Sequence, residues 1–478
     1  MRKRSIFFLS ILIALPLFSQ EKAFKIFLAD SALKNASVSF LVADADSFTT
    51  LYEYNSGKSL MPASVMKLVT TATALELLGP DYTFITTVGY TGEVNKRTGI
   101  LNGDIVIKGG GDPALGSENF EEHYGDFTGR WIEEIKKTGI SKIRGKIITD
   151  DSYYDYQPVP GKWLWEDAGN YYGAGAHGLS VYNNTYEIHF KTSSDSSDHV
   201  ITGVVPEECR AELTDRLIVS GTEDEGYVFA APYSTGGWLA GTIPANQEDF
   251  VLKASISDPP LLMAKIIYRK LRSAGIRISG EPATTRLESS VYDEFTKISE
   301  VTSPALKDII VVLNHESVNL YAEHLVKELG KVLKNNGSTL SGTEAINKFL
   351  ISAGINTDGM FMEDGSGLSP LDAVNARGIA DLLFYMKNKS RYSGEFFTSL
   401  PEAGREGTLK NYFRDPFFES RMSAKSGSMT RVRSYAGYIT TLSGKKLIFC
   451  IIVNNYSGPS RNIVSGIEEI LKEIIVSR

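Results

Sequence analysis

Ser64 and Lys67 lie three positions apart at the start of a predicted helix, in the segment MPASVMKLVTTATALELLG (residues 61–79). Residues three apart share a helix face, and a lysine on a buried face is costly unless something uses it. A serine hydroxyl becomes a nucleophile when a neighbouring base removes its proton, and burial with nearby positive charge can keep a lysine neutral enough to be that base. The pair therefore fits acyl transfer, whereas a helix-capping serine beside a solvent-reaching lysine is the ordinary structural alternative.

Two later segments favour chemistry over this alternative. Residues 317–319 read Ser-Val-Asn at a predicted helix or loop start, and residues 425–428 read Lys-Ser-Gly-Ser before a predicted hairpin. Ser-x-x-Lys followed by Ser-x-Asn and Lys-Ser/Thr-Gly is the pattern of the serine enzymes that recognise penicillin. All three motifs in this order are improbable by chance, so the sequence predicts a serine acyl-transfer site.

Each residue type in the three motifs suits one task. The helix start directs backbone N–H groups and the helix dipole at Ser64, where they stabilise developing negative charge. Ser317 offers a second hydroxyl that can relay a proton to a departing amine, and Asn319 can hydrogen-bond a substrate amide. Lys425 supplies a cation for a substrate carboxylate, and Gly427 lets a substrate backbone approach the strand edge.

The elements that must position these residues follow from patterning. Alternating apolar and polar residues predict one hairpin over residues 37–55 and another over residues 434–455, which turns at Ser443-Gly444. Residues 461–478 carry apolar residues at three-to-four spacing and predict a closing helix. Hairpins at both ends with helices between them favour an antiparallel sheet covered by helices, which is an α+β domain.

The middle of the chain has a different composition. Roughly residues 88 to 300 are rich in short predicted strands, Gly, Asp and Tyr, with one clear helix in the segment 258–280 that ends at Gly275. We therefore expect a large, mostly β insertion of two domains between the first and second motifs.

Bulk composition excludes several classes of protein. The chain has 478 residues, of which 42% are hydrophobic and 22% charged, so we expect two or three globular domains. The formal net charge of -7 is spread along the chain without a basic stripe, which argues against nucleic-acid binding. The six histidines show no metal-ligand spacing, so we expect no metal and no cofactor. Cys209 and Cys450 fall in different predicted domains and are expected to stay unpaired.

The N-terminus is typical of an exported protein. Basic MRKR precedes the apolar run SIFFLSILIALPLF, and the polar SQEK follows, which predicts a signal peptide over residues 1–20 with cleavage near Ser19 or Gln20. An uncleaved anchor is the alternative, although the apolar run is short for a full bilayer span.

Beyond the three motifs, further segments resemble a known family. The chain is similar, over essentially its whole mature length, to the D-alanyl-D-alanine carboxypeptidase/endopeptidases of the class C low-molecular-mass penicillin-binding proteins (peptidase family S13, the DacB-like group). The segments that carry this resemblance are IKGGGDPAL, TDDSYYD, DGSGLS, LPEAGREGTLKN and AKSGSMTRVRSYAGY. The long insertion between the first two motifs is another shared feature, and it separates this group from shorter carboxypeptidases and most β-lactamases.

The resemblance implies a division of the chain. A serine β-lactamase/transpeptidase-like catalytic domain would comprise residues 21–87 and 303–478. A first inserted domain would comprise residues 88–180 and 258–302, and a second residues 181–257.

The resemblance also implies a periplasmic enzyme that acts on peptidoglycan stem peptides. Ser64 would attack the carbonyl of the penultimate D-Ala while Lys67 takes its proton, and the N–H groups of Ser64 and Ser428 would form the oxyanion hole. Ser317 would pass a proton to the departing amine, and Lys425 with Ser428 would hold the terminal carboxylate. Water would then hydrolyse the acyl-enzyme, and β-lactams would acylate the same serine. When the leaving group is another stem's diaminopimelate, the same steps would cleave a cross-link.

Two positions need comment. Ser426 stands where the family's third motif usually has threonine, and it keeps the small hydroxyl. Family members use an aspartate of the first inserted domain to meet the diaminopimelate side chain, and TDDSYYD places Asp151 there, with Asp150 as the close rival. An aspartate in a strand-ending turn is the structural alternative for this position.

Two other functions compete with the peptidase. A β-lactamase would use the same chemistry with fast deacylation, but such enzymes often carry Tyr-x-Asn, so Ser317 favours the peptidase. A non-catalytic penicillin-binding scaffold is the third hypothesis, and the intact motifs argue against it. The sequence leaves open the oligomeric state and contact with a membrane surface.

Overall fold

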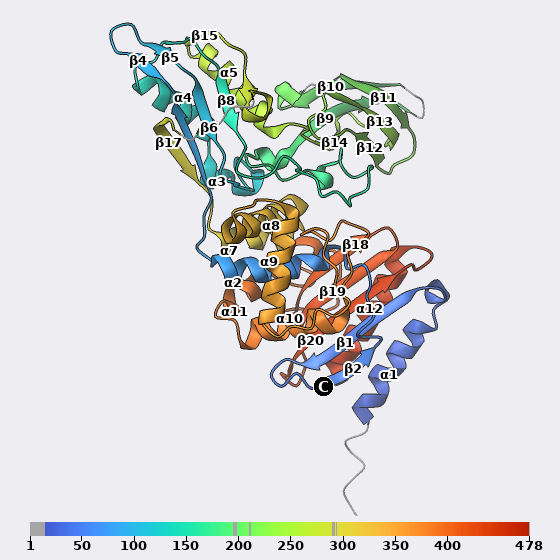
Figure 1. The fold of residues 1–478 in the computed structure, drawn as a ribbon. Helices are drawn as coiled ribbons and strands as arrows, with labels where there is room; N and C mark the ends of the chain where they lie inside the picture. Colours follow the sequence, from blue (N-terminus) through green and yellow to red (C-terminus); the bar gives the residue numbers. More distant parts are fainter. Residues whose placement is uncertain (1–14, 195–197, 210–211, 289–291, 293, 478) are drawn as a thin grey trace, which may run out of the picture.

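The computed structural model places the chain in two parts (Figure 1). The lower part contains the first and last described residues, and the upper part is formed by the middle of the chain. The structure describes residues 15–194, 198–209, 212–288, 292 and 294–477.

A five-stranded antiparallel sheet forms the centre of the lower part, in the order β18-β19-β20-β1-β2. Both predicted hairpins are confirmed, as β1-β2 and β19-β20, and they join where β1 pairs with β20. The strands are β1 (Ser37–Asp44), β2 (Thr50–Tyr54), β18 (Met422–Met429), β19 (Val432–Thr440) and β20 (Lys446–Asn454).

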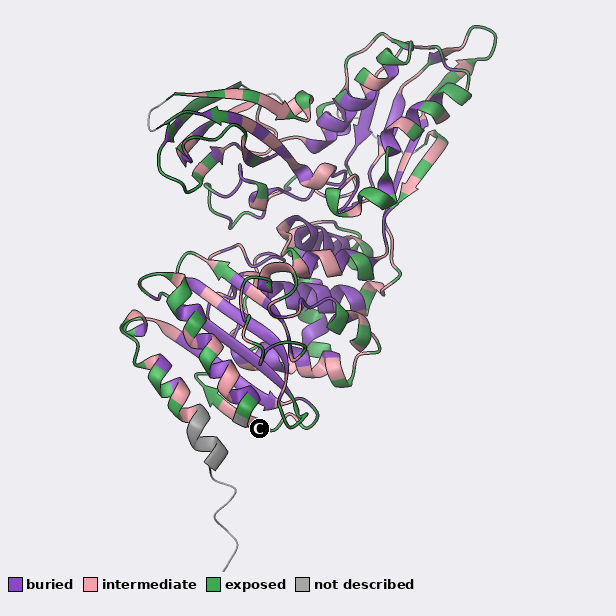
Figure 2. Ribbon diagram, turned by 180° about the vertical axis from the view of Figure 1, so that it is seen from behind, coloured by how far each residue is buried: buried purple, intermediate pink, exposed green. Residues whose placement is uncertain are grey.

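Both faces of this sheet are covered, which explains why β20 is apolar at nearly every position. Phe40 and Phe449 face one layer, formed by α1 (Leu15–Leu28) and α12 (Ser460–Ser477), the predicted closing helix. Their neighbours Leu41 and Cys450 face the opposite layer of helices. Strands β1, β19 and β20 are accordingly buried over most of their length, whereas the edge strand β2 is partly exposed (Figure 2).

The opposite layer holds the helices that carry the first two motifs. Its central member, α2, is buried at every residue from Met66 to Leu75, because it is surrounded by other helices rather than facing solvent. The helices of this layer are α2 (Met66–Leu78), α7 (Leu306–His315), α8 (Asn319–Lys334), α9 (Thr339–Ser352), α10 (Ala376–Asn388) and α11 (Ser393–Thr398).

The upper part begins with two sheets of mixed direction, ordered β16-β8-β6-β3-β17 and β15-β7-β5-β4. The predicted helix near residue 260 is α5, which ends at Ser273, shortly before Gly275 with its φ of +86°. The strands and helices of this region are β3 (Ile85–Tyr90), β4 (Glu93–Asn95), β5 (Ile100–Asn102), β6 (Ile105–Lys108), α3 (Glu121–Tyr124), α4 (Phe127–Lys137), β7 (Lys142–Ile143), β8 (Ile147–Asp150), α5 (Pro259–Ser273), β15 (Arg277–Ile278), β16 (Ala283–Thr284), α6 (Thr285–Glu288) and β17 (Thr296–Thr302).

Two three-stranded sheets complete the upper part, ordered β10-β9-β14 and β11-β13-β12. Their strands are β9 (Thr185–Thr192), β10 (His199–Val205), β11 (Glu212–Val219), β12 (Glu225–Phe229), β13 (Gly236–Ile243) and β14 (Phe250–Ser255). The sheets agree with the expected β-rich insertion, and the domain boundaries at residues 88, 181, 258 and 303 stay predictions.

Helix α8 connects the two parts through side chains along its length. Tyr321 donates to Ser117 Oγ (2.8 Å), and His324 lies against Ser180 and the carbonyl of Gly111. One turn further on, Lys327 donates to Asp155 Oδ1 (2.7 Å), and Glu328 accepts hydrogen bonds from three tyrosines, Tyr82, Tyr153 and Tyr154. The insertion therefore packs on the helix that begins with Asn319.

Most of the predicted signal peptide lies outside the described residues, and the predicted cleavage point falls within α1. The buried side chains Phe24 and Phe27 of α1 come after that point, so cleavage there would leave its packing intact. None of the helices within residues 15–477 that the structure describes is long and apolar enough to cross a membrane. Cys209 and Cys450 are both free thiols, as predicted.

Candidate active site

Ser64 lies in a single 3-10 turn, η2 (Ala63–Val65), that leads into α2. Ala63 has a φ of +46°, in the left-handed region that non-glycine residues seldom adopt and that often marks functional strain. Met61, just before this turn, is bonded to the sheet. The side chain of Asn454, at the end of β20, accepts a hydrogen bond from Met61 N (2.8 Å) and donates one to Met61 O (3.0 Å). Sheet and helix together thus fix the turn that carries Ser64.

Lys67, one turn further along, is fully buried and bonded to three neutral acceptors. Its Nζ lies 2.9 Å from Ser64 Oγ, 2.6 Å from Asn319 Oδ1 and 2.8 Å from the carbonyl oxygen of Ser366. A protonated lysine has three donors, and all three are used here. On loss of a proton the amine can turn its lone pair to the serine hydroxyl, which is the geometry of a general base.

The electrostatics of Lys67 support that role. Burial lowers the pKa of Lys67 to about 7, although the nearby carboxylates, foremost Asp364 and Glu323, act in the opposite direction. A substantial fraction of the amine is therefore neutral at physiological pH. From the sequence we expected burial and nearby positive charge together to keep this lysine neutral. The structure instead makes burial the main cause, and burial together with repulsion from Lys67 lowers the pKa of Lys425.

A second serine–lysine pair lies beside the first. Ser317 precedes α8 with a φ of +58°, and its Oγ accepts a hydrogen bond from Lys425 Nζ at 2.9 Å. Lys425 is fully buried and also donates to the carbonyl of Ser426 (2.9 Å). The second and third motifs are therefore in direct contact, although more than a hundred residues separate them in sequence.

Asn319 connects the Ser64–Lys67 pair to the insertion. Its Oδ1 accepts from Lys67, and its Nδ2 donates to the carbonyl of Tyr172, which lies in the short helix η4 (Tyr171–Gly173) of the upper part. The amide that we expected to bind substrate is in this structure bound to a loop of the insertion.

Strand β18 runs directly beside Ser64. A Cβ on Gly427 would lie 2.2 Å from Ser434 Oγ, 2.6 Å from Pro62 O and 3.1 Å from Ser64 N, so no larger residue fits. The sequence assigned this glycine to substrate approach, whereas the structure shows that it permits the strand to contact the turn of Ser64. Ser426 Oγ bonds to Thr408 Oγ1 (2.7 Å), and Ser428 is exposed two residues further along the strand.

Sequence reasoning missed a group of buried carboxylates under Lys67, namely Glu323, Asp364 and Asp372. Glu323 accepts from Gly365 N at 3.1 Å, and burial together with the charge of Asp364 raises the pKa of Glu323 to about 8. Asp364 accepts from the backbone of its own loop and from Trp163 Nε1 (2.6 Å) of the insertion. The segment DGSGLS, which contains Asp364, was the available signal.

The structure places Asp151 within the insertion, where it is only 2% exposed. Thr285 donates to its carboxylate (3.3 Å), and burial, followed by the charge of Asp258, raises the pKa of Asp151 to about 6. Its rival Asp150 accepts from Ser152 Oγ (2.6 Å). A substrate contact for either aspartate stays a prediction.

The fold and the site together are those of a serine acyl-transfer enzyme. The family model described as "D-Ala-D-Ala carboxypeptidase 3 (S13) family" matches residues 20–474. The chain therefore belongs to this family. Membership confirms the predicted enzyme class, a serine-type D-Ala-D-Ala carboxypeptidase/endopeptidase.

Individual relatives agree with this assignment. The chain is 28% identical over 446 residues to a D-alanyl-D-alanine carboxypeptidase of Actinomadura sp. (strain R39), covering 91% of this chain and 80% of that one. It is 23% identical over 458 residues to the D-alanyl-D-alanine carboxypeptidase DacB of Haemophilus influenzae, covering 94% and 92% of the two chains. The crystal structure of penicillin binding protein 4 (dacB) from Haemophilus influenzae matches with a TM-score of 0.79 at 21% identity, covering 93% of this chain and 97% of that one, which confirms the α+β fold.

Proposed function

We propose that Ser64 is the nucleophile of a D-Ala-D-Ala hydrolase that acts on peptidoglycan stem peptides. The observation that carries the proposal is the 2.9 Å contact between Ser64 Oγ and Lys67 Nζ, within a site where burial lowers the pKa of Lys67 to about 7. Lys67 removes the hydroxyl proton as Ser64 forms a bond to the carbonyl carbon of the penultimate D-Ala. The N–H groups of Ser64 and Ser428 stabilise the resulting oxyanion.

The Ser317–Lys425 pair serves the departing D-Ala. Ser317 gives its proton to the leaving amine and is reprotonated through the adjoining lysine network. Lys425 and Ser428 hold the terminal carboxylate on β18, and water then attacks the acyl-enzyme to release the shortened peptide. Ser426, which bonds to Thr408, links this strand to the short helix η7 (Gly407–Leu409).

Asn319 and the insertion control how the peptide enters. Because Asn319 Nδ2 donates to the carbonyl of Tyr172, a substrate amide must replace or share this hydrogen bond. If Asp151 meets a diaminopimelate amine, the same site also accepts a cross-linked stem and acts as an endopeptidase. We further propose export to the periplasm through the segment 1–20, since peptidoglycan lies outside the cytoplasm.

Intact-protein mass spectrometry with benzylpenicillin tests the nucleophile. A crystal structure of the Haemophilus influenzae relative is described as complexed with a β-lactam, which supports this choice of probe. We expect a stable adduct on the wild type and none on Ser64→Ala. Penicillin that is consumed without an adduct would favour a β-lactamase, and no reaction at all would favour a non-catalytic scaffold. Hydrolysis of soluble stem peptides then separates carboxypeptidase from endopeptidase activity.

A further inference from the structure

A cavity of about 550 Å³ lies in the upper part, away from the three motifs, where α3, α5 and the start of β9 meet. Its volume falls within the range of small-molecule binding sites. Buried residues, including Tyr124, Phe127 and Ile266, form its floor, and exposed residues such as Glu118 and Glu121 form its rim. It is therefore an open site with an apolar base and a polar edge.

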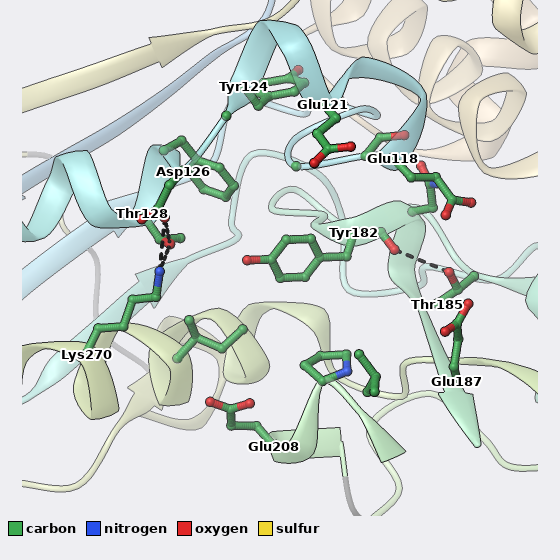
Figure 3. A pocket seen from close by; sticks show the side chains of 18 of the residues that line it. Glu118, Glu121, Tyr124, Asp126, Thr128, Tyr182, Thr185, Glu187, Glu208 and Lys270 are labelled. Carbon is green, nitrogen blue, oxygen red and sulfur yellow. Dashed lines mark hydrogen bonds and ion pairs between the residues drawn. The ribbon is translucent and has the colours of Figure 1, made fainter. Parts of the chain in front are cut away.

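Tyr182 is the central side chain of this cavity (Figure 3). It begins a run of three left-handed residues, Tyr182, Asn183 and Asn184, with φ between 50° and 55°. Such runs are costly for residues other than glycine, and this one directs the Tyr182 ring into the cavity. The Tyr182 hydroxyl has no hydrogen-bond partner among the described residues, and burial raises its pKa to about 12, so it remains a donor.

The charges around Tyr182 are largely paired with one another. Lys270 contacts Asp126 (3.0 Å), Lys253 contacts Glu118 and Glu187 (3.5 and 3.4 Å), and Arg269 contacts Glu208 (2.7 Å). Together these pairs account for every basic residue of the lining. The lining carries five carboxylates against these three basic residues, so it has an excess of negative charge and does not favour an anionic ligand.

Two acceptors remain available to an occupant. Glu208 Oε2 is buried without a hydrogen-bond partner in the described part of the chain, and Glu121 has no ionic partner there. Figure 3 shows both carboxylates on opposite sides of the Tyr182 ring. An aromatic face flanked by acceptors, with a free phenol as donor, suits a ligand that has a flat apolar face and many hydroxyl groups.

We propose that this cavity binds uncharged N-acetylated sugar units of the peptidoglycan glycan strand. The sugar ring would lie against Tyr182, its hydroxyls would donate to Glu121 and Glu208, and its acetyl methyl would contact Val205 and Pro206 at the apolar wall. The inference rests on the proposed function, because the glycan strand is the polymer to which stem peptides are attached. A second contact on the same polymer raises the effective concentration of peptide at Ser64.

The cavity is connected to the catalytic helix. Ser117 and Asn183 line it, and both bond to the Tyr321 hydroxyl (2.8 and 3.0 Å), two residues beyond Asn319 at the start of α8. A bound sugar would therefore rest on groups that fix the position of α8. The site belongs to the same rigid framework as the catalytic residues.

Titration calorimetry of the full chain with triacetylchitotriose tests the proposal. We expect the wild type to bind the triose, and Glu121→Gln and Tyr182→Phe each to raise Kd about threefold to tenfold, the effect of one lost hydrogen bond. Glu122→Gln is the matched control, because Glu122 is the exposed neighbour of Glu121 on α3 and lies outside the lining. Hydrolysis of soluble stem peptide should stay within twofold in all three variants, which also reports that they fold.

Hydrolysis of glycan-linked peptidoglycan provides the functional readout. Glu121→Gln and Tyr182→Phe should raise KM on this substrate while Glu122→Gln does not. The proposal would be overturned if the wild type does not bind the triose, or if both cavity variants bind it as tightly as the wild type. It would also be overturned if the cavity binds a cationic peptide instead of the triose. If the wild type fails to hydrolyse soluble peptides, the proposed function falls, and the triose titration still decides what the cavity binds.

Discussion

Lys67 on α2 and Lys327 on α8 have the same side chain and the same complete burial, yet their surroundings differ. Lys67 contacts a hydroxyl, an amide oxygen and a carbonyl, none of them charged. Lys327 contacts the carboxylate of Asp155 at 2.7 Å and the carbonyl of Gln157 at 2.8 Å. Burial lowers the pKa of both lysines, but a touching carboxylate favours the charged form of Lys327. The difference indicates that direct contacts, rather than burial alone, separate a base from a structural ion pair.

Replacing each lysine by methionine tests this comparison most strongly. Lys67→Met should lower kcat/KM for stem-peptide hydrolysis by about 10³-fold, because the general base is lost while the volume is kept. Lys327→Met should change it by less than about threefold, since Asp155 is partly exposed and can be solvated. Steady-state kinetics, with thermal melting of each variant to exclude unfolding, measures both. Equal losses would remove the distinction.

A substitution in the sheet, at Gly427 of β18, can change the position of Ser64 relative to Lys67. Gly427→Ala should slow acylation by benzylpenicillin by roughly 10- to 100-fold, because the added Cβ would push β18 away from Pro62 and Ser64 and misplace the nucleophile. Gly394→Ala is the control, since a Cβ there meets no atom within 4 Å. Stopped-flow acylation rates decide the matter. Unchanged acylation in Gly427→Ala would show that the close approach is not needed.

The pH dependence of acylation sharpens the assignment of the base. A base must be neutral, and burial lowers the pKa of Lys67 to about 7, so the reactive fraction rises with pH through this value. The acylation rate should increase about tenfold between pH 6 and pH 8, the change expected for one group that titrates midway. Second-order rate constants with benzylpenicillin at constant ionic strength give the profile. A flat profile over this range would exclude Lys67 as the titrating base.

The ion pair of Lys327 should matter for stability and little for activity. Asp155→Asn keeps an oxygen acceptor and removes the charge, so we expect the free energy of unfolding to fall by about 1 to 3 kcal/mol, since Lys327 stays buried. Hydrolysis should remain within about twofold of the wild type. Chemical denaturation and peptide hydrolysis on the same sample provide both numbers. A large loss of activity would place this pair in the catalytic machinery.

Much of the catalytic geometry was accessible from the sequence because chemistry restricts residue types at fixed spacing. Ser64 and Lys67 share a helix turn, so their contact follows from helix geometry. The terminal hairpins follow from apolar strand segments on either side of a polar turn, and α12 from its apolar spacing. These patterns are local, so they can be recognised from residues that are close together in the sequence.

The remaining features depend on contacts between distant segments. Glu323 looks like an ordinary helix residue until the loop of Asp364 packs against it, and no sequence spacing predicts that pairing. The hydrogen bond from Asn319 is accepted by the backbone carbonyl of Tyr172. Every residue has such a carbonyl, so the residue type does not predict this bond. Gly427 was identified from the sequence, but the reason why glycine is required there was not. The close contact with Pro62 forms only when the sheet packs against the turn that precedes α2.

Helix α8 couples the folding of the two parts of the molecule. Its buried His324, Lys327 and Glu328 find their partners in or beside the insertion, and an excised catalytic half would leave these polar groups without them. We therefore expect that removing the insertion, or replacing it with that of another protein, would destabilise the catalytic part. Both parts should melt in one cooperative transition, with the amides of α8 among the last to exchange with solvent deuterium.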